Sequence, residues 1–419
     1  MTSCTPKVTV PFTKTSYAFT GLKPYVQYSI EISAATKVGY GPRAKITQRT
    51  RESVPNGPPT KFQISGVDAT NITASWLPPD PALRNGRIIN YKLCIKIGST
   101  SQGPCLLQIT TGNITVYTFS NLKPNTKYQL RISAATKIGY GSAAVLTTRT
   151  LEAEPSGAPR NLNVVSYTKN FIKTTWSSPD SSLLNGILTK YSVCLRRQSL
   201  KSCTPKVIVP FTKTSYTFTG LKPYVQYTIE ISAGTKAGYG PRAKITQRTR
   251  ESVPNGPPIK FQITRVDITN ITSSWLPPDP ALRNGRIINY KLCIKIGNTS
   301  QGPCLLQATT GNITVYTFSN LKPYTKYHLR ISAATKIGYG PAAVLTTRTL
   351  EAEPSGAPRN LNVVSYTKNF IKATWSSPDS SLLNGILTKY SVCIRRQSLT
   401  SCTTKVTVPF SKHHIHLLV

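Results

Sequence analysis

Apolar and polar residues alternate with a period of two in several short segments of the chain. In residues 71–76, 89–95 and 128–132, every second side chain is apolar and the ones between are mostly polar. This is the pattern of half-buried antiparallel strands, because successive side chains of a strand point to opposite faces. Turn residues separate the segments, at Pro-Pro-Asp 78–80 and Arg-Asn-Gly 84–86. No segment has a helical period, so the pattern predicts an all-β chain.

The strand pattern is part of a long repeat. Residues 4–59 recur as residues 203–258, an offset of 199 residues, and the string SCTTKVTVPF restarts at Ser401. The long period halves again, because the four tryptophans are spaced 100, 99 and 100 residues apart: Trp76, Trp176, Trp275 and Trp375. The repeating unit is therefore one domain of about 100 residues, the size of a β-sandwich.

Two sequence types alternate along the repeat. We call residues 55–154 and 254–353 the type-one domains, and residues 155–253 the complete type-two domain. Residues 1–54 correspond to the C-terminal half of a type-two domain. Residues 354–419 correspond to the N-terminal half of another, which we expect to stop just after its fourth strand and to carry a divergent tail. Neither half closes a core, so we expect both halves to expose apolar faces. We expect this chain to be a fragment whose copies associate head to tail through the two halves.

The motifs of each domain resemble the fibronectin type III family. They are a tryptophan followed by two prolines at 76–79, Asn-Gly-x-Ile-x-x-Tyr at 85–91, Leu-x-Pro-x-x-x-Tyr at 122–128, and Gly-x-Gly at 139–141. The resemblance covers nearly the whole chain and implies tandem seven-stranded, immunoglobulin-like sandwiches with sheets A-B-E and C-C′-F-G. The sequences of these motifs are most similar to those in the ectodomains of receptor-type tyrosine phosphatases and neuronal adhesion proteins. No Arg-Gly-Asp occurs in the last hairpin loop, so the family's integrin-binding motif is not carried over.

The Leu-x-Pro-x-x-x-Tyr motif also predicts a local contact. A proline of fixed φ precedes a tyrosine that enters a strand, which suits a tyrosine corner whose hydroxyl bonds the nearby backbone. The same motif recurs three more times, at residues 22–28, 221–227 and 321–327. We expect this corner in every repeat.

The composition supports folded domains with an unusual charge. Lys and Arg number 52 against 14 Asp and Glu, which leaves a net charge of +38. Hydrophobic residues are still 39% of the chain, unlike a disordered polycation. No run of 18 apolar residues exists, and the first residues lack the apolar region of a signal peptide. We therefore expect no membrane span, signal peptide or anchor within this sequence.

Eight of the nine cysteines pair off by domain. By the resemblance, Cys94 lies on strand C and Cys105 lies where strand C′ begins, so a cross-link of this hairpin is sterically reasonable. Four intradomain disulfides are expected, and Cys4 is left alone: Cys94–Cys105, Cys194–Cys203, Cys293–Cys304 and Cys393–Cys402. Each would stabilise its domain by about 3 kcal/mol in the chain-entropy model. The alternatives are reduced core cysteines or zinc binding.

Glycosylation sequons occur only in the type-one domains, at Asn71, Asn113, Asn270, Asn298 and Asn312. Asn71 and Thr73 alternate with Ile72 and Ala74, so they should face solvent if Trp76 faces the core. Sequons together with paired cysteines favour an oxidising, extracellular setting, at the cell surface or secreted.

The positive charge is greatest in the type-two domain. Residues 155–253 hold 15 basic and 3 acidic residues, against 10 and 4 in residues 55–154 and 11 and 4 in residues 254–353. In the last type-two strand the cations share one parity, which puts them on one face: Arg242, Lys244, Arg248 and Arg250. Arg196 on strand C should emerge on the same sheet. The type-one counterparts that should also point outward are Lys92, Lys96 and Arg131.

This C-F-G face predicts an acidic partner. Like charges on neighbouring strands repel one another, and only Glu230 stands among them. A sulfated glycosaminoglycan, an anionic polysaccharide or an acidic protein would relieve the repulsion. Nucleic acid fits less well, because exposed aromatic residues do not interleave with the cations. The alternative is a solvated basic surface that binds nothing specific.

The sequence offers little for catalysis. The four histidines are His328, His413, His414 and His416, and no acid pair or glycine-rich phosphate loop recurs. The tail histidines could suggest a metal, but the string HHIHLLV replaces the expected TSYTFTGL at this point of the repeat. Mistaken translation past the end of an exon explains such a tail better than a metal site does. We therefore expect that the chain is not an enzyme and has no cofactor and no metal site.

The sequence thus predicts an extracellular adhesion and spacer segment of a cell-surface receptor or adhesion protein, with protein or acidic glycan ligands. One alternative is a secreted glycosaminoglycan-binding matrix protein. Another is the ectodomain of a receptor-type tyrosine phosphatase whose catalytic domain lies outside this chain. A cytosolic muscle-type array is a further alternative, and it would require reduced thiols.

Overall fold

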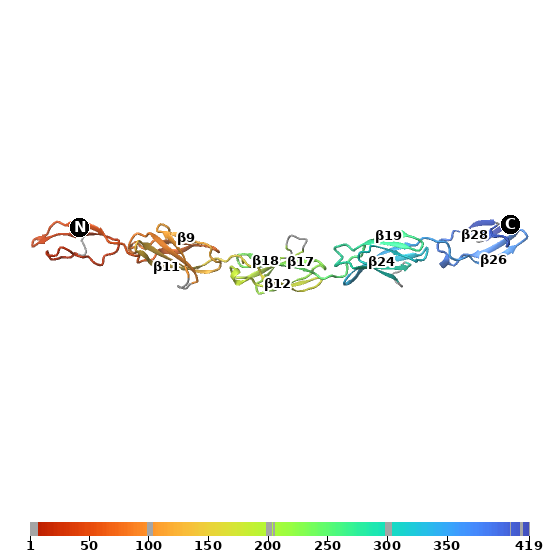
Figure 1. Cartoon of the computed structure of the whole chain (residues 1–419), viewed down its shortest axis with the longest axis horizontal. Helices are drawn as coiled ribbons and strands as arrows, with labels where there is room; N and C mark the ends of the chain where they lie inside the picture. The colour runs from red at the N-terminus through yellow and green to blue at the C-terminus, as the bar shows by residue number, and fades with distance from the viewer. Residues whose placement is uncertain are drawn as a thin grey trace.

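The domains follow one another along an extended line, with the two termini at opposite ends (Figure 1). The computed structural model describes residues 7–98, 104–197, 203, 206–297, 304–402, 404–410 and 414–418. Cys4, Asn298 and His413 lie outside these residues, and so do the predictions made for them. No helix in the described ranges is long and apolar enough to cross a membrane.

The first type-one domain is a sandwich of two antiparallel sheets. Its elements are β5 (Thr60–Val67), β6 (Ile72–Leu77), η1 (Pro81–Leu83), β7 (Asn90–Ile97), β8 (Leu106–Thr111), β9 (Val116–Phe119), β10 (Lys127–Thr136) and β11 (Gly139–Arg149). One sheet has the order β5-β6-β9 and the other β11-β10-β7-β8. In the family's letters these are A-B-E and G-F-C-C′, which confirms the predicted sheets.

The type-two domain and the second type-one domain have the same topology. The type-two elements are β12 (Arg160–Tyr167), β13 (Ile172–Ser177), η2 (Ser181–Leu183), β14 (Lys190–Arg197), β15 (Lys206–Pro210), β16 (Ser215–Phe218), β17 (Gln226–Gly234) and β18 (Tyr239–Arg248). The second type-one elements are β19 (Ile259–Val266), β20 (Ile271–Leu276), β21 (Asn289–Ile296), β22 (Leu305–Thr310), β23 (Val315–Phe318), β24 (Lys326–Thr335) and β25 (Gly338–Arg348).

The two outer parts of the chain have fewer strands. The first holds β1 (Gln27–Ile32), β2 (Ala35–Thr36), β3 (Gly39–Tyr40) and β4 (Ala44–Arg49), in the pairs β1-β4 and β2-β3. The last holds β26 (Arg359–Tyr366), β27 (Phe370–Ser376), η3 (Ser380–Leu382), β28 (Lys389–Ile394), β29 (Thr404–Pro409) and β30 (His414–Leu418). Apolar side chains are exposed in the first part, where Ile32 and Ile46 are 69% and 65% exposed.

The expectation that the last part stops just after strand C′ is wrong. Strand β30 pairs with β27, and Leu417 stands opposite Ile371. In the type-two domain Phe218 stands opposite Ile172 in the same way, so β30 takes the place of strand E. The tail keeps the register because apolar Ile415 and Leu417 alternate with polar residues, as Tyr216 and Phe218 do.

Each complete domain has its own core around the strand B tryptophan. Trp76 packs edge-on against Tyr91, with ring centroids 5.4 Å apart, and the same pair recurs in the other domains. Inward residues of both sheets surround it, such as Ile72, Leu93 and Ile132, which are at most 1% exposed. These are the apolar positions of the period-two pattern, so burial of one apolar face of each sheet drives the two sheets to pack together.

The tyrosine corner forms in all four motifs. The backbone N–H of Lys123 donates to the Tyr128 hydroxyl at 2.8 Å. The equivalent donors are Lys23, Lys222 and Lys322, at 2.8–3.0 Å. A second local bond supports the corner, because the Thr150 hydroxyl donates to the Lys123 carbonyl at 2.7 Å. The predicted corner is therefore confirmed, and it fixes the start of strand F.

The junctions between domains are short and tied on both sides. The N–H of Leu151 donates to the Asp68 carbonyl of the preceding domain, and that of Ala153 donates to the Asn185 carbonyl of the next. Only Glu152 lies between them. The Asn185 side chain donates in turn to the Glu154 carbonyl at 2.9 Å. The same side-chain bond recurs at the other junctions, from Asn85, Asn284 and Asn384.

Candidate functional site

The outward face of the G-F-C-C′ sheet is where the predicted cations can meet. In the type-two domain, Glu230 stands opposite Lys244 on one side and Cys194 on the other. Cys194 in turn stands opposite Lys206. One row across four strands therefore reads Lys244, Glu230, Cys194 and Lys206. Strand pairing, rather than sequence spacing, brings these side chains together.

Three cations converge on the Glu230 carboxylate. The Arg242 guanidinium lies 2.7 Å from it, that of Arg196 3.3 Å, and the Lys244 ammonium 3.7 Å. The Glu230 side chain is only 5% exposed, whereas those of Arg242 and Lys244 are 55% and 60% exposed. We call these four residues the Glu230 cluster. Its net charge is +2, and a hollow of about 330 Å³ opens over it, next to Cys203.

The cluster holds its carboxylate ionised. Burial alone would raise the pKa of Glu230, but the hydrogen bond from Arg242, the charge of Lys244 and the bond from Arg196 outweigh it. The pKa of Glu230 therefore lies below its usual value. Because the carboxylate is fixed under the cations, it holds the three basic side chains close together.

The same arrangement recurs 199 residues earlier. Glu31 accepts from Arg43 at 3.0 Å and lies 3.6 Å from Lys45. These residues correspond to Glu230, Arg242 and Lys244. Sequence reasoning noted the type-two stripe but not this second copy, although the 199-residue offset could have identified it.

Two other predicted type-two cations have partners of their own. Arg248 stays on the strand and its guanidinium lies 4.8 Å from the centre of the Tyr224 ring. Arg250 does not belong to the face, which corrects the sequence prediction. Strand pairing ends at Arg248, and the Arg250 guanidinium lies 5.3 Å from the Tyr167 ring on β12. Parity along a sequence carries no information beyond the last paired residue.

The type-one face differs from the prediction. Lys92 and Arg131 are exposed, but Lys96 is only 6% exposed and does not contribute an open cation. Alternation predicts the face of the sheet on which Lys96 lies, but it does not predict which side chains cover it. The aliphatic stem of a lysine readily packs along neighbouring side chains. The Lys92 ammonium lies 5.2 Å from the Tyr140 ring. The type-one face therefore holds fewer exposed cations than the type-two face.

The structure brings each predicted cysteine pair together as a disulfide. Cys94 pairs with Cys105 and Cys293 with Cys304, each with Cα atoms 5.6 Å apart. In the type-two sequences the pairs Cys194–Cys203 and Cys393–Cys402 have Cα atoms 5.8 Å apart. Each links strand C to the start of strand C′, on the outward face. In the type-two domain this cystine lies beside Glu230, and the two sulfurs and the carboxylate form a compact group.

That group is poorly suited to a metal ion in the oxidised protein. Its two sulfur atoms are bonded to each other, and its carboxylate is shared by three cations. A metal ion needs deprotonated thiolates and would meet the positive charge of the Glu230 cluster. His328 lies on β24, opposite Lys295 rather than beside a cysteine.

The described sequons lie in two turns of the type-one domains. Asn113 and Asn312 are exposed in the turn between strands C′ and E. Asn71 and Asn270 are half-buried in the turn between strands A and B, and the Asn71 amide donates to Asp68 at 2.9 Å. Ile72 and Ala74 are fully buried, so the inward side of this alternation is as expected.

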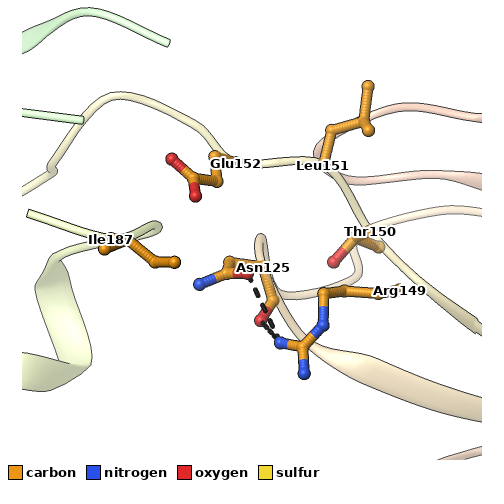
Figure 2. Close-up of a pocket in the computed structure, with 6 residues that line it drawn as sticks. All are labelled: Asn125, Arg149, Thr150, Leu151, Glu152 and Ile187. Atoms are coloured by element: carbon orange, nitrogen blue, oxygen red, sulfur yellow. Dashed lines mark hydrogen bonds between the residues drawn. The ribbon is translucent and has the colours of Figure 1, made fainter. Parts of the chain in front are cut away.

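A second surface depression lies at a domain junction. A shallow groove of about 680 Å³ is lined by Asn125, Arg149, Thr150, Leu151, Glu152 and Ile187, whose side chains are drawn in Figure 2. Arg149 donates to the Asn125 carbonyl at 2.7 Å, so its guanidinium is already engaged. Ile187 comes from the next domain. The groove is a consequence of how consecutive domains meet, and it lacks the charge of the Glu230 cluster.

The comparisons with known proteins agree with this architecture. The family model "Fibronectin type III domain" matches residues 57–149, 157–249 and 256–348. The phosphatidylinositol phosphatase PTPRQ of Rattus norvegicus is 30% identical over 394 residues, 92% of this chain and 16% of that protein. The cell adhesion molecule DSCAML1 of Gallus gallus is 28% identical over 437 residues, 95% of this chain and 21% of that protein. The chain thus spans about a fifth or less of these relatives.

Among solved structures, the chicken CNTN1 FN1-FN3 domains align with 71% of this chain and all of that one, at 20% identity and a TM-score of 0.35. The matched relatives are similar to this chain through extracellular regions of cell-surface proteins, and the matched domains are non-catalytic modules. With three family matches over more than half of its length, this chain belongs to the fibronectin type III family.

Proposed function

We propose that this chain is a non-enzymatic adhesion and spacer segment at the cell surface, in which the type-two domains bind acidic partners. The observation that carries the proposal is the Glu230 cluster, with three cations over one buried carboxylate. The extended domain array supplies the spacer, and the receptor-like relatives support a place in a receptor or adhesion protein.

A sulfated or carboxylated glycan suits the cluster for electrostatic reasons. The cations are already in position, so binding does not have to order three long side chains. The net charge of +2 persists after pairing with Glu230, and Lys206 extends the positive row across the sheet. Binding to such a surface should weaken steeply with salt, because it releases counterions and is screened.

Heparin retention of the full chain tests this proposal. We expect Arg242→Gln with Lys244→Gln, combined with Arg43→Gln and Lys45→Gln, to lower the salt concentration that elutes the chain. A matched control with the same loss of charge is Lys173→Gln with Lys213→Gln, Lys169→Gln and Lys222→Gln, away from the cluster. If both variants elute at the same salt concentration, only net charge matters and the proposed site is wrong.

A receptor phosphatase ectodomain is the second candidate for the parent protein. The specific observation in its favour is the similarity to PTPRQ and to the tyrosine-protein phosphatase Lar of Drosophila melanogaster, which is 29% identical over 90% of this chain and 19% of Lar. The coding sequence downstream of this chain distinguishes the two candidates, because the phosphatase requires a membrane span followed by a catalytic domain.

A further inference from the structure

The two domain types carry different chemistry at the same place on the same sheet. In the type-two domain the central row of the outward face has Lys244, Glu230 and Lys206 around the cystine. In the first type-one domain the row is Val145, Arg131, Cys94 and Leu107. A cation thus replaces the buried acid, and aliphatic residues replace the two lysines.

The aliphatic residues of this type-one row lie open to solvent. Val145 and Leu107 are 47% and 50% exposed, and Ile109, opposite Lys92 in the next row, is 51% exposed. They lie on β11 and β8, on either side of β10 and β7, so they flank the exposed Arg131 on both sides. The type-one face thus presents one arginine flanked by aliphatic side chains, whereas the type-two face presents a cluster of cations.

Arg131 has no acidic partner within the described part of the chain. None of the ion pairs found there includes Arg131 or its counterpart Arg330. The acids of the same domain have other roles: Asp68 accepts three bonds in its turn, and Asp80 caps η1. Glu152 accepts from the backbone N–H of Lys236 in the next domain, and the Glu154 carboxylate lies beside Gly238 of that domain. No carboxylate of this domain is placed to neutralise Arg131.

We infer that the outward face of the type-one domains binds an acidic protein segment, with one carboxylate on Arg131 and neighbouring apolar side chains on Val145, Leu107 and Ile109. An arginine fork pairs a carboxylate in a bidentate way, and the pair strengthens when apolar contacts exclude water. Arginine is enriched among the few residues that dominate the energetics of protein interfaces.

A protein segment fits this face better than a glycan does. A sulfated glycan presents many charges and few apolar groups, whereas this row offers one free guanidinium between aliphatic side chains. Lys92 is engaged by Tyr140 and Lys96 is covered. The inference concerns different domains and different residues from the Glu230 cluster, so it does not depend on the function proposed above.

The second type-one domain repeats the face, although Arg330 is half-buried where Arg131 is exposed. Its row is Val344, Arg330, Cys293 and Leu306, with Val344 and Leu306 49% and 55% exposed. Ala308 stands opposite Lys291 where Ile109 stands opposite Lys92. The second face has less apolar surface, so it should bind the same segment more weakly.

The test uses the full chain and short synthetic peptides of defined sequence, with binding measured by fluorescence anisotropy. In the test peptide a central Glu is flanked by Leu and Val, and the matched peptides carry Gln or Lys at the centre. We expect the Glu peptide to bind at least tenfold more tightly than the Lys peptide. Arg131→Gln with Arg330→Gln should weaken it at least tenfold, and Arg131→Gln alone should have more effect than Arg330→Gln alone.

Two variants complete the design. Lys137→Gln with Lys336→Gln removes the same charge in the turn between strands F and G and should leave the affinity unchanged. Leu107→Thr with Leu306→Thr keeps all charges and should weaken binding severalfold. The inference is overturned if Glu and Lys peptides bind equally, if no peptide binds, or if heparin oligosaccharides bind through Arg131 more tightly than the Glu peptide does.

Discussion

At the scale of single residues, the interactions of a charged side chain depend on the residues that stand opposite it in the sheet. Position 230 carries a glutamate and the equivalent position 131 an arginine, and both stand opposite a cystine half. The glutamate collects three cations, whereas the arginine remains available at the surface. The residue at this position and its neighbours in the row therefore decide whether the sheet presents a cation cluster or an arginine flanked by aliphatic side chains.

Replacing Glu230 with glutamine should destabilise the type-two domain by about 1–3 kcal/mol, because three cations lose their charged partner. The effect depends on pH. Since the pKa of Glu230 lies below its usual 4.5 in the folded domain, the carboxylate stabilises the fold fully above that value. This contribution is lost as the pH falls through the folded pKa, so wild type and Glu230→Gln should converge in acid.

Hydrogen exchange at pH values between 3 and 7 measures this effect domain by domain. The amides of β14 and β17 report on the type-two domain, and those of β7 and β10 are an internal control. A difference between wild type and variant that is the same at pH 3 and pH 7 would contradict the assigned role of Glu230.

At the scale of elements, strand C′ is held by its disulfide and by pairing with one neighbouring strand. Strand β8 pairs only with β7, as the last strand of its sheet, and the Cys94–Cys105 bond joins the two where the hairpin closes. Two of its outward residues, Leu107 and Ile109, are half exposed and add little core packing. The disulfide thus holds strand C′, with Leu107 and Ile109, against the rest of the proposed type-one binding face.

Changing Cys94 and Cys105 together to serine should lower the stability of the first type-one domain by about 3 kcal/mol, through loss of the loop constraint on the unfolded chain. Before global unfolding, β8 should lose its exchange protection while β5, β6 and β9 retain theirs. The unchanged Cys293–Cys304 domain is the control in the same molecule. Equal loss of protection in both sheets would show that the disulfide does not act on the hairpin.

At the scale of the whole molecule, side-chain hydrogen bonds link consecutive domains of the extended array. Each junction is anchored by an asparagine side chain of the following domain, as by Asn85 on the Val54 carbonyl. Asn85 has φ +54°, so Asn85→Gly keeps the backbone geometry and removes only the bond. We expect Asn85→Gly with Asn284→Gly to shorten the maximum dimension in small-angle X-ray scattering while circular dichroism stays the same.

Asn113→Gly, in an exposed turn far from the junctions, is the matched control and should leave the scattering profile unchanged. If the asparagine variants at the junctions are as extended as wild type, the side-chain bonds do not hold the domains in line.

Most of the fold could be predicted from the sequence because its determinants are local or repeated. Period-two alternation gave the strands, tryptophan spacing gave the unit, and Leu-x-Pro-x-x-x-Tyr gave the corner at Tyr128. The tail was the exception. The string HHIHLLV departs from the repeat and predicts its end, but the alternation at Ile415 and Leu417 is enough for strand pairing.

The candidate site was less predictable, since it depends on register between strands. Parity along one strand placed Arg242 and Lys244 together correctly. It could not show that Arg250 turns toward Tyr167, that Lys96 is covered, or that Val145 and Leu107 stand in one row with Arg131. These facts need the alignment of neighbouring strands and the side chains that lie over them.

The asparagine bonds at the junctions also bear on how the array carries mechanical load. A pull on the chain at residues 53 and 54 meets two bonds to Asn85 before it reaches β5, one from the Ser53 amide and one to the Val54 carbonyl. Tension therefore passes into the loop between strands B and C rather than peeling the edge strand from its sheet. Since forced unfolding is governed by the unfolding rate, a load that bypasses this edge strand should slow the unfolding of the domain that follows each junction.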